Sequence, residues 1–174
     1  MQVIKIKKGL DIPLKGKAMS MISGSFIPDT IAIKPADFVN VLPKLMVSPG
    51  EHVKAGSPLF YNKYDEQIIF TSPVSGEVME PLRGEKRLIM EIPVKVDKEI
   101  EYEKFGTHHL ASLDAEAIRS LLLKSGLWTY IRQRPYDIIP SITSIPRDIY
   151  ISTFDTSPLA PDYNFILKDK MHYF

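Results

Sequence analysis

The stretch V-S-P-G-E-H-V-K-A-G-S-P-L at Val47–Leu59, followed by T-S-P-V-S-G-E-V at Thr71–Val78, decides the fold. Short apolar runs alternate there with Pro and Gly, a pattern that predicts short β-strands joined by tight turns. Gly50 and Gly56 stand where such turns need a positive φ or a close backbone approach. Between the two stretches, Ile68–Thr71 is apolar enough to predict a buried strand.

The flanking sequence extends this β-pattern in both directions. Val3–Lys7 alternates apolar and polar residues as an edge strand does, and Thr30–Lys34 is a further extended segment. Leu88–Ile92 and Val94–Val96 are expected to be the last strands of the set. The charged segment Arg83–Arg87 is predicted to be a hairpin tip, either a solvated turn or a docking point for an acidic surface.

One helix is predicted after the β-rich part. Asp114 is a good N-cap, and Leu113 can form a hydrophobic staple with Ile118. Ile118, Leu121 and Leu122 share one helical face at i, i+3, i+4 spacing. Gly126 is a suitable residue to end the helix.

The last part of the chain predicts the beginning of an open α/β sheet. A strand at Asp148–Thr153 is followed by the turn-rich segment Asp155–Asp162, as in a first βα unit. A single strand cannot form a sheet with a core, so we expect a truncated chain that lacks its partner strands. The expected fold class is α+β, mainly β, with an N-terminal β extension (residues 1–34), a β-domain (35–100), and a helix leading into an incomplete Rossmann-like α/β domain (101–174).

Composition excludes several classes of function. The net charge is +1, from 22 basic and 21 acidic residues, so no global field attracts nucleic acid. With 0 cysteines, disulfides, thiolate nucleophiles, iron–sulfur ligation and cysteine zinc sites are excluded within this sequence. The spacing of the 4 histidines does not predict a metal site either.

No apolar run approaches the roughly 20 residues of a membrane-spanning helix, and no apolar segment follows the N-terminal lysines, so we expect neither a spanning helix nor a secretory signal.

The Val47–Val78 pattern resembles the barrel-sandwich hybrid fold of biotinyl and lipoyl domains. Those domains carry a modified lysine, in D-K-A or M-K-M context, on the hairpin that corresponds here to Tyr61–Gln67. Counted back from Pro73, the modified position falls near Asp65 or Glu66 and not on a lysine, and nearby Lys63 lacks both flanking signatures. The fold is therefore expected without the carrier function. A carrier or transporter-adaptor domain stays an alternative, as does a non-carrier interaction module.

Six further segments, in order along the chain, narrow the resemblance: Lys5–Leu14, Phe70–Gly76, Arg83–Arg87, Ser125–Trp128, Arg132–Pro135 and Asp155–Ala160. Together they resemble the A subunit of the sodium-translocating NADH:quinone reductase, up to about Asp162. The related C subunit of Rnf electron-transport complexes is the alternative, and the S-G-L-W and R-x-R-P segments favour the A subunit of the reductase.

The resemblance implies a peripheral subunit on the cytoplasmic face of a bacterial inner membrane. The complex would pass electrons from NADH to quinone and export sodium, so this chain would be one subunit of a translocase without catalysis of its own. The flavins and iron–sulfur centres of the complex are expected in partner subunits, and no cofactor is expected in this chain. Quinone is the candidate substrate.

The candidate site follows the predicted helix. Trp128 and Tyr130 lie near Arg132 and Arg134, so an aromatic face beside guanidinium groups could hold a quinone ring and donate to its carbonyl oxygens. The alternative is that Trp128 packs a domain junction and the arginines pair with acids elsewhere in the complex. Asp155 follows the last predicted strand, where open α/β sheets place ligand contacts, or it closes an Asx turn or caps a helix. Without a G-x-G-x-x-G turn, NADH binding is not expected.

Overall fold

The structure, a computed structural model, describes residues 5, 14–16, 19–24, 26–109, 112–152, 155, 157 and 160–170. The chain divides into two compact units, one from Ile27 to Ile145 and the other from residues 1–26 and 146–174. The strand predicted at Val3–Lys7 lies, apart from Lys5, outside the described residues.

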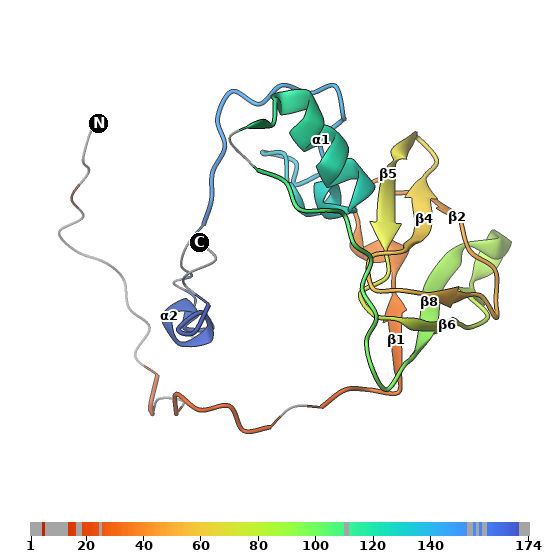
Figure 1. Cartoon of the computed structure of the whole chain (residues 1–174), viewed down its shortest axis with the longest axis horizontal. Coiled ribbons are helices and arrows are strands. Elements are labelled where there is room, and N and C mark those ends of the chain that lie inside the picture. The colour runs from red at the N-terminus through yellow and green to blue at the C-terminus, as the bar shows by residue number, and fades with distance from the viewer. Residues whose placement is uncertain are drawn as a thin grey trace. The chain divides into compact units, whose positions relative to one another are not determined.

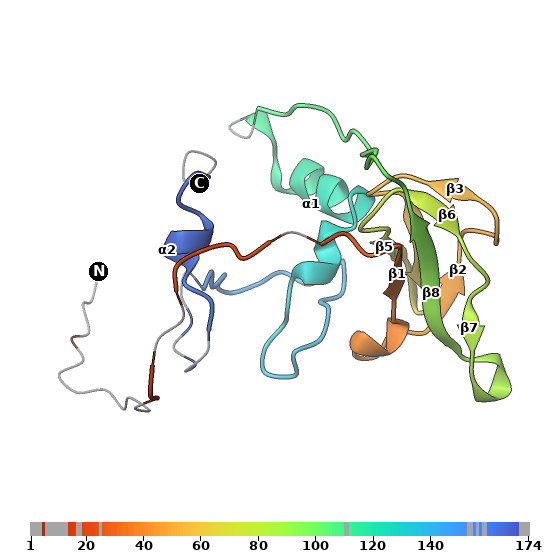
Figure 2. The same cartoon turned by 90° about the horizontal axis from the view of Figure 1, so that it is seen from below.

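Two antiparallel sheets build the first unit (Figures 1 and 2). The larger has the order β1-β8-β6-β3, with β7 added to β8, and the smaller has the order β2-β4-β5. The strands are β1 (Thr30–Ile33), β2 (Pro43–Leu45), β3 (His52–Val53), β4 (Pro58–Asn62), β5 (Asp65–Thr71), β6 (Gly76–Val78), β7 (Leu82–Arg83) and β8 (Ile89–Val96). The predicted strands between Thr30 and Val96 are therefore confirmed, in a mainly β architecture.

One apolar core lies between the sheets. Ile92 and Val94 of β8 are buried at alternate positions, as expected of a strand with one face on the core, and Ile89 is buried as well, while Met90 and Lys95 are exposed. In the smaller sheet, the rings of Phe60 and Phe70 stack with centroids 4.4 Å apart. The buried apolar side chains of the core are Val53, Leu59, Phe60, Ile68, Phe70, Val74, Val78, Ile89, Ile92, Val94 and Trp128.

The turns take the conformations that their glycines predict. Gly50 has a φ of 85° and Gly56 a φ of 101°, both in the left-handed region. The Arg83–Arg87 segment is confirmed as a hairpin tip, with the 3-10 helix η2 (Glu85–Arg87) joining β7 to β8. Figure 2 shows this hairpin extending beyond the rest of its sheet.

The strand break predicted at Pro93 is wrong, because β8 runs through it from Ile89 to Val96. Proline lacks a backbone donor, but its carbonyl oxygen can still accept. Here that oxygen accepts from the amide of Met79 at 2.9 Å, so the ladder with β6 continues past the ring.

The helix predicted after Asp114 is confirmed as α1 (Ala115–Lys124), which packs against β5 and the 3-10 helix η4 (Leu127–Tyr130). A further 3-10 helix, η1 (Pro35–Asp37), follows β1.

The strand predicted at Asp148–Thr153 is wrong for residues 148–152, which carry no strand pairing to any other described residue. A strand needs a neighbour to bond with, and apolar composition alone cannot supply one. The second unit instead contains a short helix, α2 (Tyr163–Ile166), capped by Asp162.

Candidate functional site

The segment after α1 holds four of the five predicted site residues, and local contacts fix its start. The side chain of Asp114 accepts from the amide of Ala117 at 2.7 Å, satisfying one of the free donors of the first helical turn. Gly126 ends the helix with a φ of 75°, as predicted. A Cβ at Gly126 would lie 2.7 Å from the Thr71 side chain, so glycine also lets this turn approach β5 closely.

Trp128 is part of the core, with 8% of its surface exposed. Its indole N–H donates to the carbonyl oxygen of Pro140 at 2.9 Å, so both the ring and the donor are engaged inside the chain. Beside it, the hydroxyl of buried Thr129 donates to the carbonyl oxygen of Gly126 at 2.8 Å. These contacts fix η4 against the β-sandwich and the loop near Pro140.

The other three residues are exposed: Tyr130 ends η4, and Arg132 and Arg134 lie in the loop that follows. Tyr130 has 80% of its surface exposed, and Arg132 and Arg134 are also exposed. The amide of Gln133 donates to the carbonyl oxygen of Ile138 at 2.8 Å, which closes the loop, and Arg134 lies 3.7 Å from the Asp137 carboxylate. Tyr130 presents a phenol to solvent and the two arginines present guanidinium groups, and such groups donate hydrogen bonds to carbonyl oxygens.

Asp155 belongs to the second compact unit. Its Oδ1 accepts from the backbone amide of Ser157 at 2.8 Å and from the Ser157 hydroxyl at 2.7 Å. A carboxylate that accepts from the amide two residues later closes an Asx turn, one of the interpretations that the sequence allowed. This carboxylate therefore has a local structural role.

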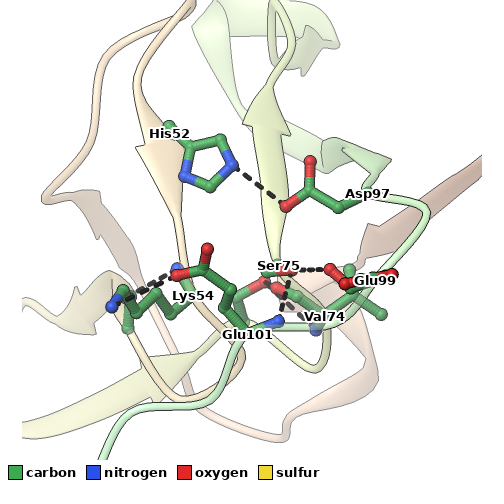
Figure 3. A network of polar contacts seen from close by, with 9 residues as sticks. His52, Lys54, Val74, Ser75, Asp97, Glu99 and Glu101 are labelled. Atoms are coloured by element: carbon green, nitrogen blue, oxygen red, sulfur yellow. Dashed lines mark hydrogen bonds and ion pairs between the residues drawn. The ribbon is translucent and has the colours of Figure 1, made fainter.

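A polar seam, shown in Figure 3, was not predicted from the sequence. We call it the linker seam: the contacts that join residues 97–103, after β8, to residues 52–57 and to Ser75. His52 Nε2 lies 3.0 Å from Asp97 Oδ2, and Lys54 Nζ lies 3.2 Å from Glu101 Oε2. Because these partners are more than 40 residues apart in the sequence, no local pattern signals them.

Backbone bonds carry most of the linker seam. The amide of Ala55 donates to the Glu101 carbonyl oxygen at 2.9 Å, and the Glu103 amide donates to the Ala55 carbonyl oxygen at 2.8 Å. The hydroxyl oxygen of buried Ser75 accepts from the Glu101 amide at 2.9 Å. The ion pairs themselves are exposed, and such pairs contribute only about 0–1 kcal/mol. With the Ser75 hydroxyl engaged in this way, we interpret the seam as a joint that fixes the path of the chain from β8 toward α1.

The β4–β5 hairpin contains Tyr61–Gln67, the segment that resembles the carrier hairpin of biotinyl and lipoyl domains. Its turn consists of Lys63 and Tyr64, and Asn62 pairs with Asp65 across it. Asp65 and Glu66, near which the count back from Pro73 falls, are the first residues of β5, directly after this turn. A lysine does occupy the tip, although neither neighbour matches a carrier signature.

Comparison with protein families decides the affiliation. Residues 4–97 match the family described as the NqrA N-terminal barrel-sandwich hybrid domain, and residues 113–174 match the NqrA second alpha/beta domain. The chain belongs to the NqrA family. This confirms the expected fold class, and the second match extends the similarity beyond Asp162, where the sequence resemblance ended.

Several curated NqrA proteins are similar along almost the whole chain. They are named as the A subunit of the Na(+)-translocating NADH-quinone reductase, which favours the NqrA family over the Rnf alternative. The proteins of Actinobacillus pleuropneumoniae serotype 5b and Haemophilus influenzae (strain PittGG) are 37% and 38% identical over 169 residues, and that of Glaesserella parasuis serovar 5 is 34% identical. Each alignment covers 96% of this chain and 38% of the relative, so the chain spans well under half the length of these NqrA proteins.

Proposed function

We propose that this chain acts as a peripheral subunit of a sodium-translocating NADH:quinone oxidoreductase, in the position of NqrA. The observation that carries the proposal is the pair of consecutive NqrA domain matches, together with relatives named for this reductase. In this role the chain supports electron transfer from NADH to quinone, coupled to sodium export, through its contacts with sibling subunits.

The proposed subunit binds no redox cofactor of its own. Iron–sulfur clusters are held mainly by cysteine thiolates, and this sequence contains 0 cysteines. No glycine-rich turn of the G-x-G-x-x-G type is available to cradle a dinucleotide phosphate. The flavins and iron–sulfur centres of the reductase are accordingly assigned to partner subunits.

The proposed location is the cytoplasmic face of a bacterial inner membrane. Among the helices in the described part of the chain, none has the length and apolar composition that a bilayer crossing requires. A subunit of a membrane complex built in this way would be held by its neighbours, so its membrane attachment should depend on the other subunits.

Quinone contact is proposed for the exposed loop after η4. Of the two aromatic rings predicted there, Trp128 is buried, which leaves Tyr130 as the ring available for stacking. Arg132 and Arg134 are the donors available to quinone carbonyl oxygens. In the assembled reductase, Tyr130→Ala combined with Arg132→Ala should raise the KM for quinone several-fold and leave the KM for NADH unchanged. Tyr136→Ala, at a second exposed tyrosine of the same loop, is the matched control.

The assignment to the reductase is tested by co-purification. An affinity-tagged form of the protein is expressed with the other reductase subunits of its organism, and detergent-solubilised membranes are passed over the affinity resin. We expect the sibling subunits to elute in fixed stoichiometry together with NADH:quinone reductase activity. When the siblings are omitted, the tagged protein should no longer sediment with the membrane. Recovery of the tagged protein without any sibling would refute the assignment.

A further inference from the structure

A groove lies between β2 and the β7–β8 hairpin of the first unit. Its volume is about 520 Å³. It is lined by Leu42, Pro43, Lys44, Leu45, Arg83, Glu85, Lys86, Arg87, Leu88 and Ile89. Its apolar lining comes from both walls, so an occupant would bury apolar surface as well as charge.

The charge on this groove is strongly one-sided. Four cationic side chains, Lys44, Arg83, Lys86 and Arg87, face one carboxylate, Glu85. All four cations are exposed, and none forms an ion pair with another residue that the structure describes. The net charge of the whole chain is only +1, so this cluster is a local concentration of positive charge. Such a surface attracts an anionic partner.

The backbone of the hairpin tip adopts an unfavourable conformation. Lys86 and Arg87 have φ values of 54° and 62°, in the left-handed region that side chains other than glycine rarely adopt. The guanidinium of Arg83 donates to the Arg87 carbonyl oxygen at 3.4 Å across the tip. Positive φ at both central residues is the type I′ geometry of a tight hairpin turn, and here it presents two consecutive cationic side chains from one turn.

One wall of the groove is a sheet edge, and the other is the hairpin tip, formed mainly by η2 and the residues that lead into β8. β2 is an end strand of the three-stranded sheet, and β7 pairs only with β8 in the described part of the chain. An exposed sheet edge can bind an extended peptide through its main chain, with alternate side chains entering pockets on either side. We propose that this groove binds an extended acidic segment of a sibling subunit, in which carboxylates alternate with apolar residues.

This inference rests on the proposed function, because the partner belongs to the same reductase. An anionic lipid surface would be a different partner. A groove between two walls, with apolar as well as cationic lining, fits a peptide better than a flat bilayer does, because its apolar lining can be covered only by a segment that enters it.

The direct test uses the full chain and a fluorescein-labelled peptide in which glutamate alternates with valine. Fluorescence anisotropy at low salt should show saturable binding that weakens as salt is added, since the contact is largely electrostatic. In the variant Lys44→Glu/Arg87→Glu, a glutamate on each wall repels the carboxylates of the peptide. The affinity for the peptide should therefore fall roughly tenfold or more. The milder variant Lys44→Gln/Arg87→Gln should show an intermediate loss, and its thermal melt checks that the fold is kept.

The matched control is Lys98→Glu/Lys104→Glu, which makes the same charge change at exposed lysines that do not line the groove. This variant should bind the peptide as the unmodified chain does. Equal losses in both variants would mean that only net charge matters, which overturns the proposal. Tight binding to vesicles of phosphatidylserine and phosphatidylcholine, without peptide binding, would also overturn it in favour of a membrane partner.

The same variants in the co-purification assay distinguish this inference from the proposed function. Loss of a sibling subunit with Lys44→Glu/Arg87→Glu, and retention with the control, would support the groove as the docking site. If all variants co-purify normally, the groove assignment fails while the assignment to the reductase stands. If the unmodified protein recovers no sibling, the assignment to the reductase fails and the groove proposal fails with it.

Discussion

Among the glycines that the structure describes, Gly76 leaves the least room for a side chain. Its φ is 154°, and a Cβ built there would lie 1.9 Å from the carbonyl oxygen of Lys95 in β8. Because a carbonyl of the neighbouring strand cannot move aside without breaking the β6–β8 pairing, Gly76→Ala should destabilise the fold by roughly 2 kcal/mol or more. Urea unfolding of the chain measures this.

Gly24→Ala provides the control for this substitution. A methyl group added at Gly24 would meet no other atom within 4 Å, and the φ of this residue is not left-handed. The control should change stability by no more than about 0.5 kcal/mol, as ordinary surface substitutions do. Equal effects at the two positions would show that the close approach of β6 to β8 is not present in solution.

Lys63 lies in the turn of the β4–β5 hairpin, the segment that resembles the lysine-bearing hairpin of carrier domains. Its neighbours Asn62 and Tyr64 match neither carrier signature. We expect the intact mass of the chain to remain unchanged after co-expression with lipoyl or biotinyl ligase. A mass increase that Lys63→Arg abolishes would revive the carrier alternative.

Among the elements, α1 depends on its N-terminal cap. The helix has no fully buried residue, so packing compensates poorly for a lost cap. Asp114→Ala removes the 2.7 Å acceptor for the Ala117 amide and should cost about 1 kcal/mol of stability. Asp114→Asn keeps an acceptor and should cost much less. Thermal unfolding of the two variants compares them, and indistinguishable melts would contradict the role of the cap.

The elements that the sequence predicted correctly are those defined by residues close together in the sequence. Capping residues on both sides define α1, and glycines at left-handed positions define the turns at Gly50 and Gly56. The continuous β8 was not predicted, because whether a strand tolerates Pro93 depends on which atoms its neighbour bonds. The strand expected at residues 148–152 is absent because pairing needs a partner that composition cannot reveal.

The candidate site was only partly predicted, because burial and long-range contacts do not follow from local sequence. Trp128 and Tyr130 were singled out together, but only their contacts show that one is buried in the core and the other exposed. The linker seam and the basic groove both join segments that are distant in sequence, so neither could be derived from spacing. Arg83–Arg87 was recognised as a charged tip, whereas Lys44 on the facing wall was not.

At the scale of the whole molecule, the segment before α2 exposes a run of apolar side chains. Ile149 and Ile151 are 79% and 83% exposed, with Tyr150 between them. Exposed apolar runs of this kind are typical of surfaces that bind another protein segment. The double substitution Ile149→Ser/Ile151→Ser should lower the fluorescence of the apolar dye ANS bound to the chain. Lys168→Ser/Lys170→Ser should leave the fluorescence unchanged, and the opposite ranking would contradict the exposure of this run.

The described parts of the molecule are consistent with a scaffold: a β-sandwich, a seam that fixes the following linker, and a basic groove at one edge. The central claim is that such a chain supports a redox complex without holding redox chemistry. The most direct test is the visible absorption spectrum of the purified protein, combined with an assay of NADH oxidation. We predict no flavin absorbance and no NADH oxidation by the chain alone. A stoichiometric flavin that remains bound through purification would contradict the account.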